Sequence, residues 1–258
     1  MPGLAARLET VGNGRFFLKA VPLDSPARDL YLREAEANSA LGGDAIAPLM
    51  LWWSVSHGWV VMVFEYVEGR EADLSPGSSD LPEVTALLRR LASLTVWPDA
   101  PPVARNMGAL RDKAGALLAG RTGGEHRKLC RTVLERFDQD SVAGDRLVHY
   151  DLSPGNLRIS GGGLKVLDWS FACAGADWLD PALLLPRFIE AGHTPAQAEA
   201  LMTALPAWRG APADGVTGLA VLWTLFREYK AMHGPEELRS ARRRAADAGR
   251  AWIEYRAA

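Results

Sequence analysis

The sequence predicts an α+β fold of two lobes, with a small antiparallel β-rich lobe at the N-terminus and a larger helical lobe behind it. Two observations indicate this division of the 258 residues. Apolar strand-like runs separated by turn residues fill positions 1–68, and apolar residues at helical spacing dominate positions 81–258. Residues 69–80 (GREADLSPGSSD) are polar and rich in Gly, Pro and Ser, which is typical of a linker.

The first lobe is expected to begin with a hairpin. Residues 6–11 and 15–21 are strand-like, and Gly12-Asn13-Gly14 between them tolerates the positive φ angles of a tight turn. Ser25 and Pro26 then suit the N-cap and first position of a helix that runs to about Leu41 and stops at Gly42-Gly43. Two more strands are expected near 48–55 and 59–67.

The second lobe shows a helical pattern from its first residues. One apolar face is formed at helical spacing by Leu81, Val84, Leu87, Leu88 and Leu91. Further helices are expected near 104–120 and 124–138 and from about 181 to the end. Between them lies a short β segment, with strands expected at 147–149, 157–160 and 164–167.

Composition excludes several classes of protein. A hydrophobic fraction of 48% and a charged fraction of 23% fit a soluble globular chain, and a net charge of −2 gives no pull toward nucleic acid or an anionic membrane. No apolar run is long enough for a membrane span, and residues 1–20 lack the apolar core of a secretory signal. Cys130 and Cys173 form neither a disulfide framework nor a zinc motif. We expect a cytoplasmic protein.

The chemistry-bearing residues lie in the middle of the chain. His149-Tyr150-Asp151-Leu152-Ser153-Pro154-Gly155-Asn156 is followed, at the end of an apolar strand, by Asp168. Phosphoryl transfer needs a carboxylate to accept the proton of the attacking hydroxyl, which suits Asp151. It also needs oxygen ligands for Mg²⁺, which suit Asn156 and Asp168. A simple polar turn would use the same residue types, but the second Asp at this distance favours the catalytic interpretation.

These residues resemble the aminoglycoside phosphotransferase and choline kinase branch of the protein-kinase-like superfamily. The chain reads HYDLSPGN, then VLDW, then GADWLDPA, similar to HGDLHPGN, IDW and GDPxxDLA in that branch. The resemblance spans roughly residues 8–185. It implies a bilobal protein-kinase-like fold and an ATP- and Mg²⁺-dependent transfer to a hydroxyl of a small molecule. It also implies that Asp180 is a structural carboxylate and that His149 braces the catalytic loop.

The front lobe fits the same pattern. A kinase needs a strand lysine that contacts the ATP phosphates and a glutamate on the next helix to hold it. Lys19 is alone in an apolar strand, where an ammonium needs a partner, although a solvent-facing edge lysine is the simpler alternative. Of Glu34 and Glu36, the family spacing favours Glu34. The stretch Phe64–Gly69 resembles the family's hinge, so backbone groups around Glu65, Tyr66 and Val67 are expected to hold adenine, beside an apolar slot lined by Met62 to Phe64.

The sequence also departs from the family. Only eighteen residues precede Lys19, so the first strand and the phosphate-covering loop are expected to be missing or reduced to 1–6. Weak ATP affinity, a substitute cover from elsewhere or from a partner chain, and a start codon placed too late all remain open. Tyr150 replaces the family's usual Gly, and Ser153 its usual His or Lys. The sequence does not decide whether either change reshapes the site.

The acceptor site is expected among the C-terminal helices, and the residues there leave its chemistry open. Carboxylates suit a polycation, and aromatic faces suit a quaternary ammonium. Both kinds are present: Glu190, Asp214, Glu228, Glu236 and Glu237, and Trp178, Trp208, Trp223, Phe226, Tyr229 and Trp252. The residues of the motifs resemble the aminoglycoside branch most, which favours an aminoglycoside-type or other antibiotic, or a polar metabolite, over choline or homoserine. The alternative is a weak or inactive kinase-like scaffold that binds a ligand or a protein partner. Oligomeric state stays unknown.

Overall fold

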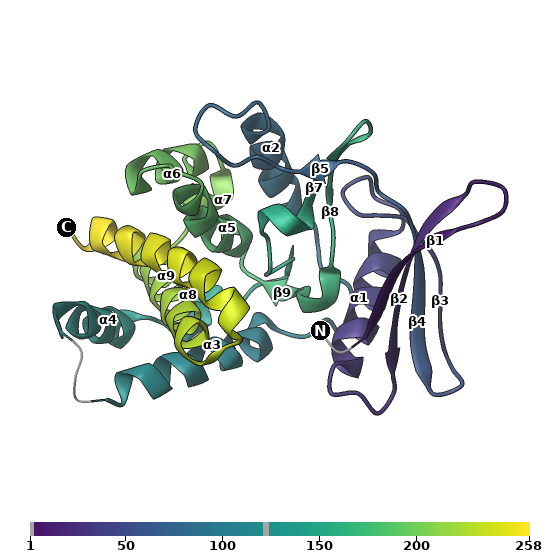
Figure 1. The fold of residues 1–258 in the computed structure, drawn as a ribbon. Helices are drawn as coiled ribbons and strands as arrows, with labels where there is room; N and C mark the ends of the chain where they lie inside the picture. The colour runs from purple at the N-terminus through teal and green to yellow at the C-terminus, as the bar shows by residue number, and fades with distance from the viewer. Residues whose placement is uncertain (1–2, 121–123) are drawn as a thin grey trace.

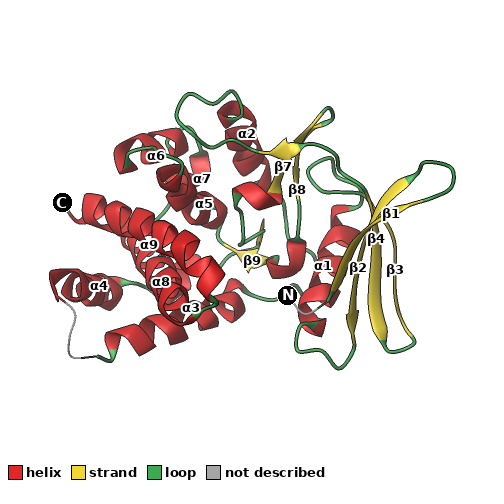
Figure 2. Ribbon diagram, in the orientation of Figure 1, coloured by secondary structure: helices red, strands yellow, loops and turns green. Residues whose placement is uncertain are grey.

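Strands gather in one lobe and helices in the other (Figures 1 and 2). The structure, a computed structural model, describes residues 3–120 and 124–258. The smaller lobe holds an antiparallel sheet of order β1-β2-β4-β3 and one helix. Its elements are β1 (Leu4–Glu9), β2 (Arg15–Pro22), α1 (Arg28–Leu41), β3 (Met50–Ser56) and β4 (Trp59–Glu65). The expected bilobal α+β fold is confirmed, and within the described residues a single strand, β1, precedes the lysine strand β2.

Local signals set the limits of these elements. Asn13 takes a φ of 60° in the turn between β1 and β2, as the Gly-Asn-Gly sequence predicts. Helix α1 ends where Gly42 adopts a left-handed φ of 58° and its N–H donates to the carbonyl of Asn38. The helix starts at Arg28 rather than at Pro26, because Ser25 accepts a hydrogen bond from the Ala27 amide at 3.2 Å within the turn that precedes the helix.

The register of the sheet decides which way Lys19 points. Residues directly opposite each other in an antiparallel pair share a face, and Lys19 lies opposite Met62 while Val21 lies opposite Val60. Val21, Val60 and Met62 are fully buried beneath α1. Lys19 therefore faces the helix and the interior instead of solvent, which excludes the solvent-facing edge interpretation.

The larger lobe is built around a long buried helix. Its helices are α2 (Leu81–Leu91), α3 (Val103–Leu118), α4 (Gly124–Arg136), α5 (Leu179–Glu190), α6 (Pro195–Met202), α7 (Pro206–Arg209), α8 (Ala213–His233) and α9 (Glu236–Ala257). Most of α8 is inaccessible to solvent, including Leu222 and Leu225, and it packs against α3, α4 and α9. The helical prediction for this lobe is confirmed.

Short strands between the helices carry the loops of the site. β6 (Arg146–Val148) pairs with β9 (Cys173–Gly175), and β7 (Leu157–Ser160) pairs with both β5 (Arg70–Glu71) and β8 (Gly163–Val166). The expected strands are present within one residue of their predicted limits. Strands β5 and β9 were not expected, because two or three residues show no periodicity that a sequence pattern could reveal.

The segment expected as a linker packs onto the larger lobe. Ala72 and Leu74 are buried in that lobe's core, and the Arg70 guanidinium forms an ion pair with Asp80 at 2.5 Å. The division of the chain at residues 68 and 81 stays a prediction.

Two further sequence expectations concern cysteines and membranes. Cys130 and Cys173 are both buried free thiols, as their spacing predicts. In the described ranges, no helix combines the length and the apolar character required to cross a bilayer.

We predict that Gly69→Ala destabilises the protein more than Gly77→Ala does. Gly69 has a φ of 132°, and an added Cβ would lie 1.9 Å from the carbonyl oxygen of Ile159. Gly77 also has a positive φ, of 82°, but open space around it. Gly77→Ala therefore measures the cost of placing alanine at a positive φ, about 1 kcal/mol. Gly69→Ala adds a steric clash to that cost, so we expect its free energy of unfolding, measured in urea, to fall by about 3 kcal/mol or more. Equal losses would contradict the packing of this segment against β7.

Candidate active site

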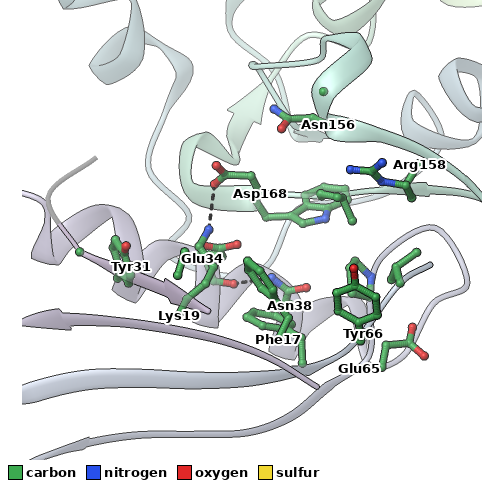
Figure 3. Close-up of a pocket in the computed structure, with 18 of the residues that line it drawn as sticks. Phe17, Lys19, Tyr31, Glu34, Asn38, Glu65, Tyr66, Asn156, Arg158 and Asp168 are labelled. Carbon is green, nitrogen blue, oxygen red and sulfur yellow. Dashed lines mark hydrogen bonds and ion pairs between the residues drawn. The ribbon is translucent and has the colours of Figure 1, made fainter. Parts of the chain in front are cut away.

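A buried ammonium joins the two lobes. Lys19 Nζ donates to Glu34 Oε2 at 2.5 Å within the smaller lobe and to Asp168 Oδ1 at 3.2 Å across the cleft (Figure 3). The Lys19 and Glu34 side chains are 10% and 3% exposed, so both charges have lost most of their water. Glu36, the alternative partner, is exposed on the other side of α1. The structure thus brings together three of the residues singled out from the sequence.

Burial and charge act against each other in this cluster. Burial raises the pKa of Glu34 to about 7, although the Lys19 ammonium opposes this. Burial by itself would lower the pKa of Lys19, but the charges of Glu34 and Asp168 outweigh it and raise that pKa. Burial would raise the pKa of Asp168, but Lys19 holds it below its ordinary value. Asp168 is therefore a carboxylate at neutral pH.

The loop that carries Asp151 is held in place by hydrogen bonds to two buried side chains, those of Asp180 and His149. The buried Asp180 carboxylate accepts the amide hydrogens of His149 and Tyr150 at 2.8 and 2.9 Å. His149 is fully buried; its Nε2 lies 3.0 Å from the Leu167 carbonyl, and its Nδ1 accepts from the Asp151 amide at 3.3 Å. These contacts assign the proton to Nε2. Asp180 and His149 position the loop, in the roles that the family resemblance implies.

Asp151 is mostly buried but open at its carboxylate, which accepts no hydrogen bond from a described residue. Its carbonyl oxygen accepts from Asn156 Nδ2 at 2.8 Å, which orients the Asn156 amide. Burial raises the pKa of Asp151, and His149, Arg227 and Arg187 oppose this rise. Asp151 is not among the residues that line the main cavity.

A cavity of about 530 Å³ lies between the lobes. Its walls include Lys19, Glu34, Glu65, Tyr66, Val67, Asn156 and Asp168, which are seven of the eight site residues predicted from the sequence. Sequence reasoning missed Phe17, Tyr31, Asn38 and Arg158, which also line it (Figure 3). For Phe17 the signal was available, because it stands two residues before Lys19 in β2 and so shares its face. No local sequence signal identifies Tyr31, Asn38 or Arg158 as a lining residue.

The expected adenine-binding segment forms one end of the cavity. The backbone groups of Tyr66 and Val67 make no hydrogen bond with other described residues and are free to bind a ligand. Glu65 is partly committed, since its amide donates to the Leu49 carbonyl at 2.9 Å and its carboxylate accepts from Lys165 at 2.8 Å. This ion pair directs its side chain away from the cavity (Figure 3).

Two of the expected wall residues lie elsewhere. Phe64 lines the cavity and Val63 does not, while Met62 is fully buried in the core of the smaller lobe and does not reach the cavity. The prediction for Met62 was wrong because an alternating strand shows only which face is buried. It does not show whether a buried side chain meets the helix or the cleft.

The residues on the C-lobe side of the cavity fit a magnesium–nucleotide complex. Asp168 supplies a carboxylate and Asn156 an amide oxygen, both hard ligands that suit Mg²⁺. No group of three or more His, Cys, Asp or Glu side chains able to hold a metal occurs in the described part of the chain. Mg²⁺ in proteins usually keeps several waters and is bound through one or two carboxylates together with phosphate oxygens.

Comparison with known proteins agrees with this geometry. The chain belongs to the phosphotransferase enzyme family, whose model matches residues 5–213, and this membership indicates a small-molecule kinase. No curated protein sequence matches the chain. The family that the sequence motifs suggested is therefore confirmed.

Solved structures show the same fold at low sequence identity. Choline kinase LicA from Streptococcus pneumoniae has a TM-score of 0.65 at 16% identity, covering 96% of this chain and 89% of that one. Macrolide 2'-phosphotransferase MphH from Brachybacterium faecium has a TM-score of 0.58 at 16% identity, covering 96% and 89%. A thermostable mutant of aminoglycoside phosphotransferase APH(4)-Ia, in ternary complex with ADP and hygromycin B, has 0.59 at 17%, covering 96% and 94%.

We predict that Lys19→Met destabilises the protein in a pH-dependent way. Without the ammonium, the Glu34 carboxyl is buried unpaired and must take up a proton to fold. A carboxyl whose pKa is raised in the folded state loses stability as pH rises from its unfolded value, about 4.5, through its folded value. We expect a small loss near pH 5 and a loss of about 3 kcal/mol near pH 8, measured by urea unfolding.

Two variants control this prediction. Lys19→Met/Glu34→Gln removes the titrating carboxyl and should abolish the extra pH dependence. Lys165→Met breaks the more exposed pair with Glu65 and should cost less than about 1 kcal/mol at either pH. A Lys19→Met penalty that is the same at pH 5 and pH 8 would contradict the buried pairing.

Proposed function

We propose that this protein is an ATP- and Mg²⁺-dependent O-phosphotransferase that acts on a hydroxyl of a small molecule. The observation that carries the proposal is the contact between Lys19 and Asp168 across the cleft, at 3.2 Å, at the edge of a cavity large enough for a nucleotide. A kinase needs a cation from one lobe and a metal-binding carboxylate from the other to meet at the phosphates of ATP.

The two ends of the cavity suggest the orientation of the nucleotide. The free backbone groups of Tyr66 and Val67 and the ring of Phe64 suit a flat heteroaromatic base. The charged cluster of Lys19 and Asp168 lies at the other end and suits phosphates. A structural relative, APH(4)-Ia, is reported with ADP bound, which supports this role for the cavity.

The proposed chemistry divides among three side chains. Asp151 accepts the proton of the acceptor hydroxyl, because its carboxylate is open and lies at the end of a braced loop. Asn156 and Asp168 would hold Mg²⁺, which neutralises charge on the phosphates when bound. Lys19, held by Glu34, would contact the same phosphates. We place the activity in the cytoplasm, where ATP is supplied and buried thiols stay reduced.

We predict that Asp151→Asn abolishes turnover and leaves nucleotide binding intact. The amide is nearly the same size as the carboxylate but cannot accept the proton in the transition state, so we expect kcat to fall by about 100-fold or more. MgADP affinity, measured by calorimetry, should change less than about threefold because the residue does not line the cavity.

This experiment also separates the enzyme from a scaffold. Full activity in Asp151→Asn would refute its assignment as the base. If millimolar Mg-nucleotide gives neither heat nor a thermal shift with the wild-type protein, a kinase-like scaffold that binds another ligand is favoured. A scaffold has no physical need for the Lys19, Asn156 and Asp168 arrangement.

We predict that kcat/KM falls on the acid side at a pH above the ordinary range of an aspartate. Asp151 acts only when deprotonated, and burial raises its pKa, so the loss of activity should begin above about pH 4 and deepen as pH decreases. The measurement is ADP release against pH with saturating MgATP. An acid limb with a midpoint below about pH 3.5 would contradict the buried position of this carboxyl.

A further inference from the structure

Two arginines of the larger lobe share one aromatic ring. Arg187 belongs to α5 and Arg227 to α8, and both guanidinium groups lie over the ring of Trp223, at 5.1 and 4.9 Å from its centroid. Both charges act on the Asp151 carboxyl and lower its pKa, which places them within electrostatic reach of the proposed base. Neither arginine was singled out from the sequence.

Arg227 is mostly buried and lacks a polar partner. Among the described residues, none makes a hydrogen bond or an ion pair with its guanidinium, and its Nε is sealed from water without a partner. Its two Nη atoms are not among the sealed atoms, so this end of the group is open. Burial and the neighbouring charge of Arg187 lower the pKa of Arg227 to about 10, and it remains a cation at neutral pH. A mostly buried cation without a counterion is costly and needs an explanation.

The surroundings of Arg227 contain more donors than acceptors. Arg187 is bound by Glu190 at 2.8 Å, but its Nε is also sealed and unpartnered. The Tyr150 hydroxyl is a third such atom, and the charge of Arg227 acts on it as well. Tyr150 adopts a left-handed φ of 73°, a conformation that favours the glycine of related sequences. The chain thus keeps a strained, bulky residue at this position.

Two carboxylates of the C-terminal helices that could bind a cation are already paired within the protein. Glu228 is paired with Arg127 at 2.5 Å and with Arg250 at 3.0 Å, and Glu190 is paired with Arg187. Asp214 is exposed at the start of α8. Glu228 and Glu190 are therefore not available to a polycation.

The aromatic faces are occupied in the same way. The Trp223 ring carries two guanidinium groups, and the Tyr229 ring carries the Lys113 ammonium at 4.9 Å. Phe226 is approached by Arg227 and by Lys230. Trp178 and Trp252 are buried in the core. Trp208 stacks on Trp252, with the ring centroids 6.5 Å apart. Each ring of this set is therefore buried or already in contact with a charged group or another ring, which disfavours a cage around a quaternary ammonium.

We propose that the acceptor is a hydroxylated small molecule carrying an anionic group, a carboxylate or a phosphate, which Arg227 binds with the help of Arg187. This inference rests on the proposed function and narrows its substrate class. It replaces the aminoglycoside-type antibiotic that the sequence motifs favour with an anionic acceptor. Guanidinium binds carboxylate and phosphate through paired N–H donors. The anion would hold the molecule with its hydroxyl facing Asp151. The hydroxyl proton passes to Asp151, its oxygen bonds to the γ-phosphorus of ATP, and the bond from that phosphorus to the bridging oxygen breaks to release ADP.

The direct test follows the Arg Nε–H signals of ¹⁵N-labelled protein during titration. Four probes differ in charge: 4-hydroxybutanoate carries a carboxylate, glycerol 3-phosphate a phosphate, 4-hydroxybutanamide no charge, and choline a cation. We expect saturable shifts of the Arg227 signal with one or both anions at millimolar concentration and none with the other two. Whichever anion binds more tightly identifies the group. The signal is assigned by its loss in Arg227→Lys.

Matched variants separate recognition from folding. Arg227→Met should weaken binding of the preferred anion by about tenfold or more, and Arg227→Lys should weaken it less because the charge remains. Arg89→Met, on the exposed face of α2, should change nothing. Tyr150→Phe removes a sealed hydroxyl that has no partner, so it is a second control in which neither Tm nor anion affinity should fall.

The outcomes distinguish this inference from the proposed function. Anion-specific shifts that disappear in Arg227→Met support it. Binding of choline or of the neutral amide in preference to both anions, or no shift of the Arg227 signal with either anion, overturns it. MgADP is titrated separately by calorimetry. If the anions bind but MgADP does not, the phosphotransferase function fails while the anion site stands.

Discussion

The arrangement of the two lobes depends on partners for one buried charge, the ammonium group of Lys19. Lys19 faces the interior because of the register of β2, and a charge at that depth is stable only with partners. One partner, Glu34, comes from the same lobe, and the other, Asp168, comes from the lobe opposite. Since neither lobe alone supplies both, the pairing links the two lobes at the wall of the cavity. The same contact therefore serves the fold and the proposed chemistry.

The other parts of the site are held by buried groups that have no role in the reaction. Asp180 fixes the Asp151 loop by accepting hydrogen bonds from two backbone amides, and the His149 ring bonds to the carbonyl of Leu167, directly before Asp168. Across the interface, Arg33 of α1 donates to Asn106 of α3 at 2.7 Å, and Asn106 donates in turn to the Phe171 carbonyl. These contacts limit the freedom of the groups that would meet the substrate, which is the condition for preorganised catalysis.

Asp151 is influenced by groups of opposite charge. Asp168, which with Asn156 lines the cavity and offers oxygen atoms suited to a metal ion, raises its pKa. Arg227, whose guanidinium has no hydrogen-bond or ion-pair partner among the described residues, lowers it. Burial raises the pKa of Asp151 most, and His149 and the two arginines oppose this rise, which suits a group that has to be ionised and then take up a proton. The family fold is shared with enzymes of different substrates, so the acceptor has to be inferred from the side chains of this chain.

The sequence by itself determined the features that depend on neighbours along the chain. The hairpin at Asn13, the end of α1 at Gly42, the Asp151–Asn156 loop and its distance to Asp168 are all set by local conformational preferences and spacing. Only the tertiary structure decided the rest. It showed that Met62 belongs to the core, that Glu65 binds Lys165, and that the Arg227 guanidinium lies over the Trp223 ring without a hydrogen-bond partner. These relations depend on how distant elements pack, and no periodicity or turn signal encodes which side chains a packed helix leaves without a hydrogen bond.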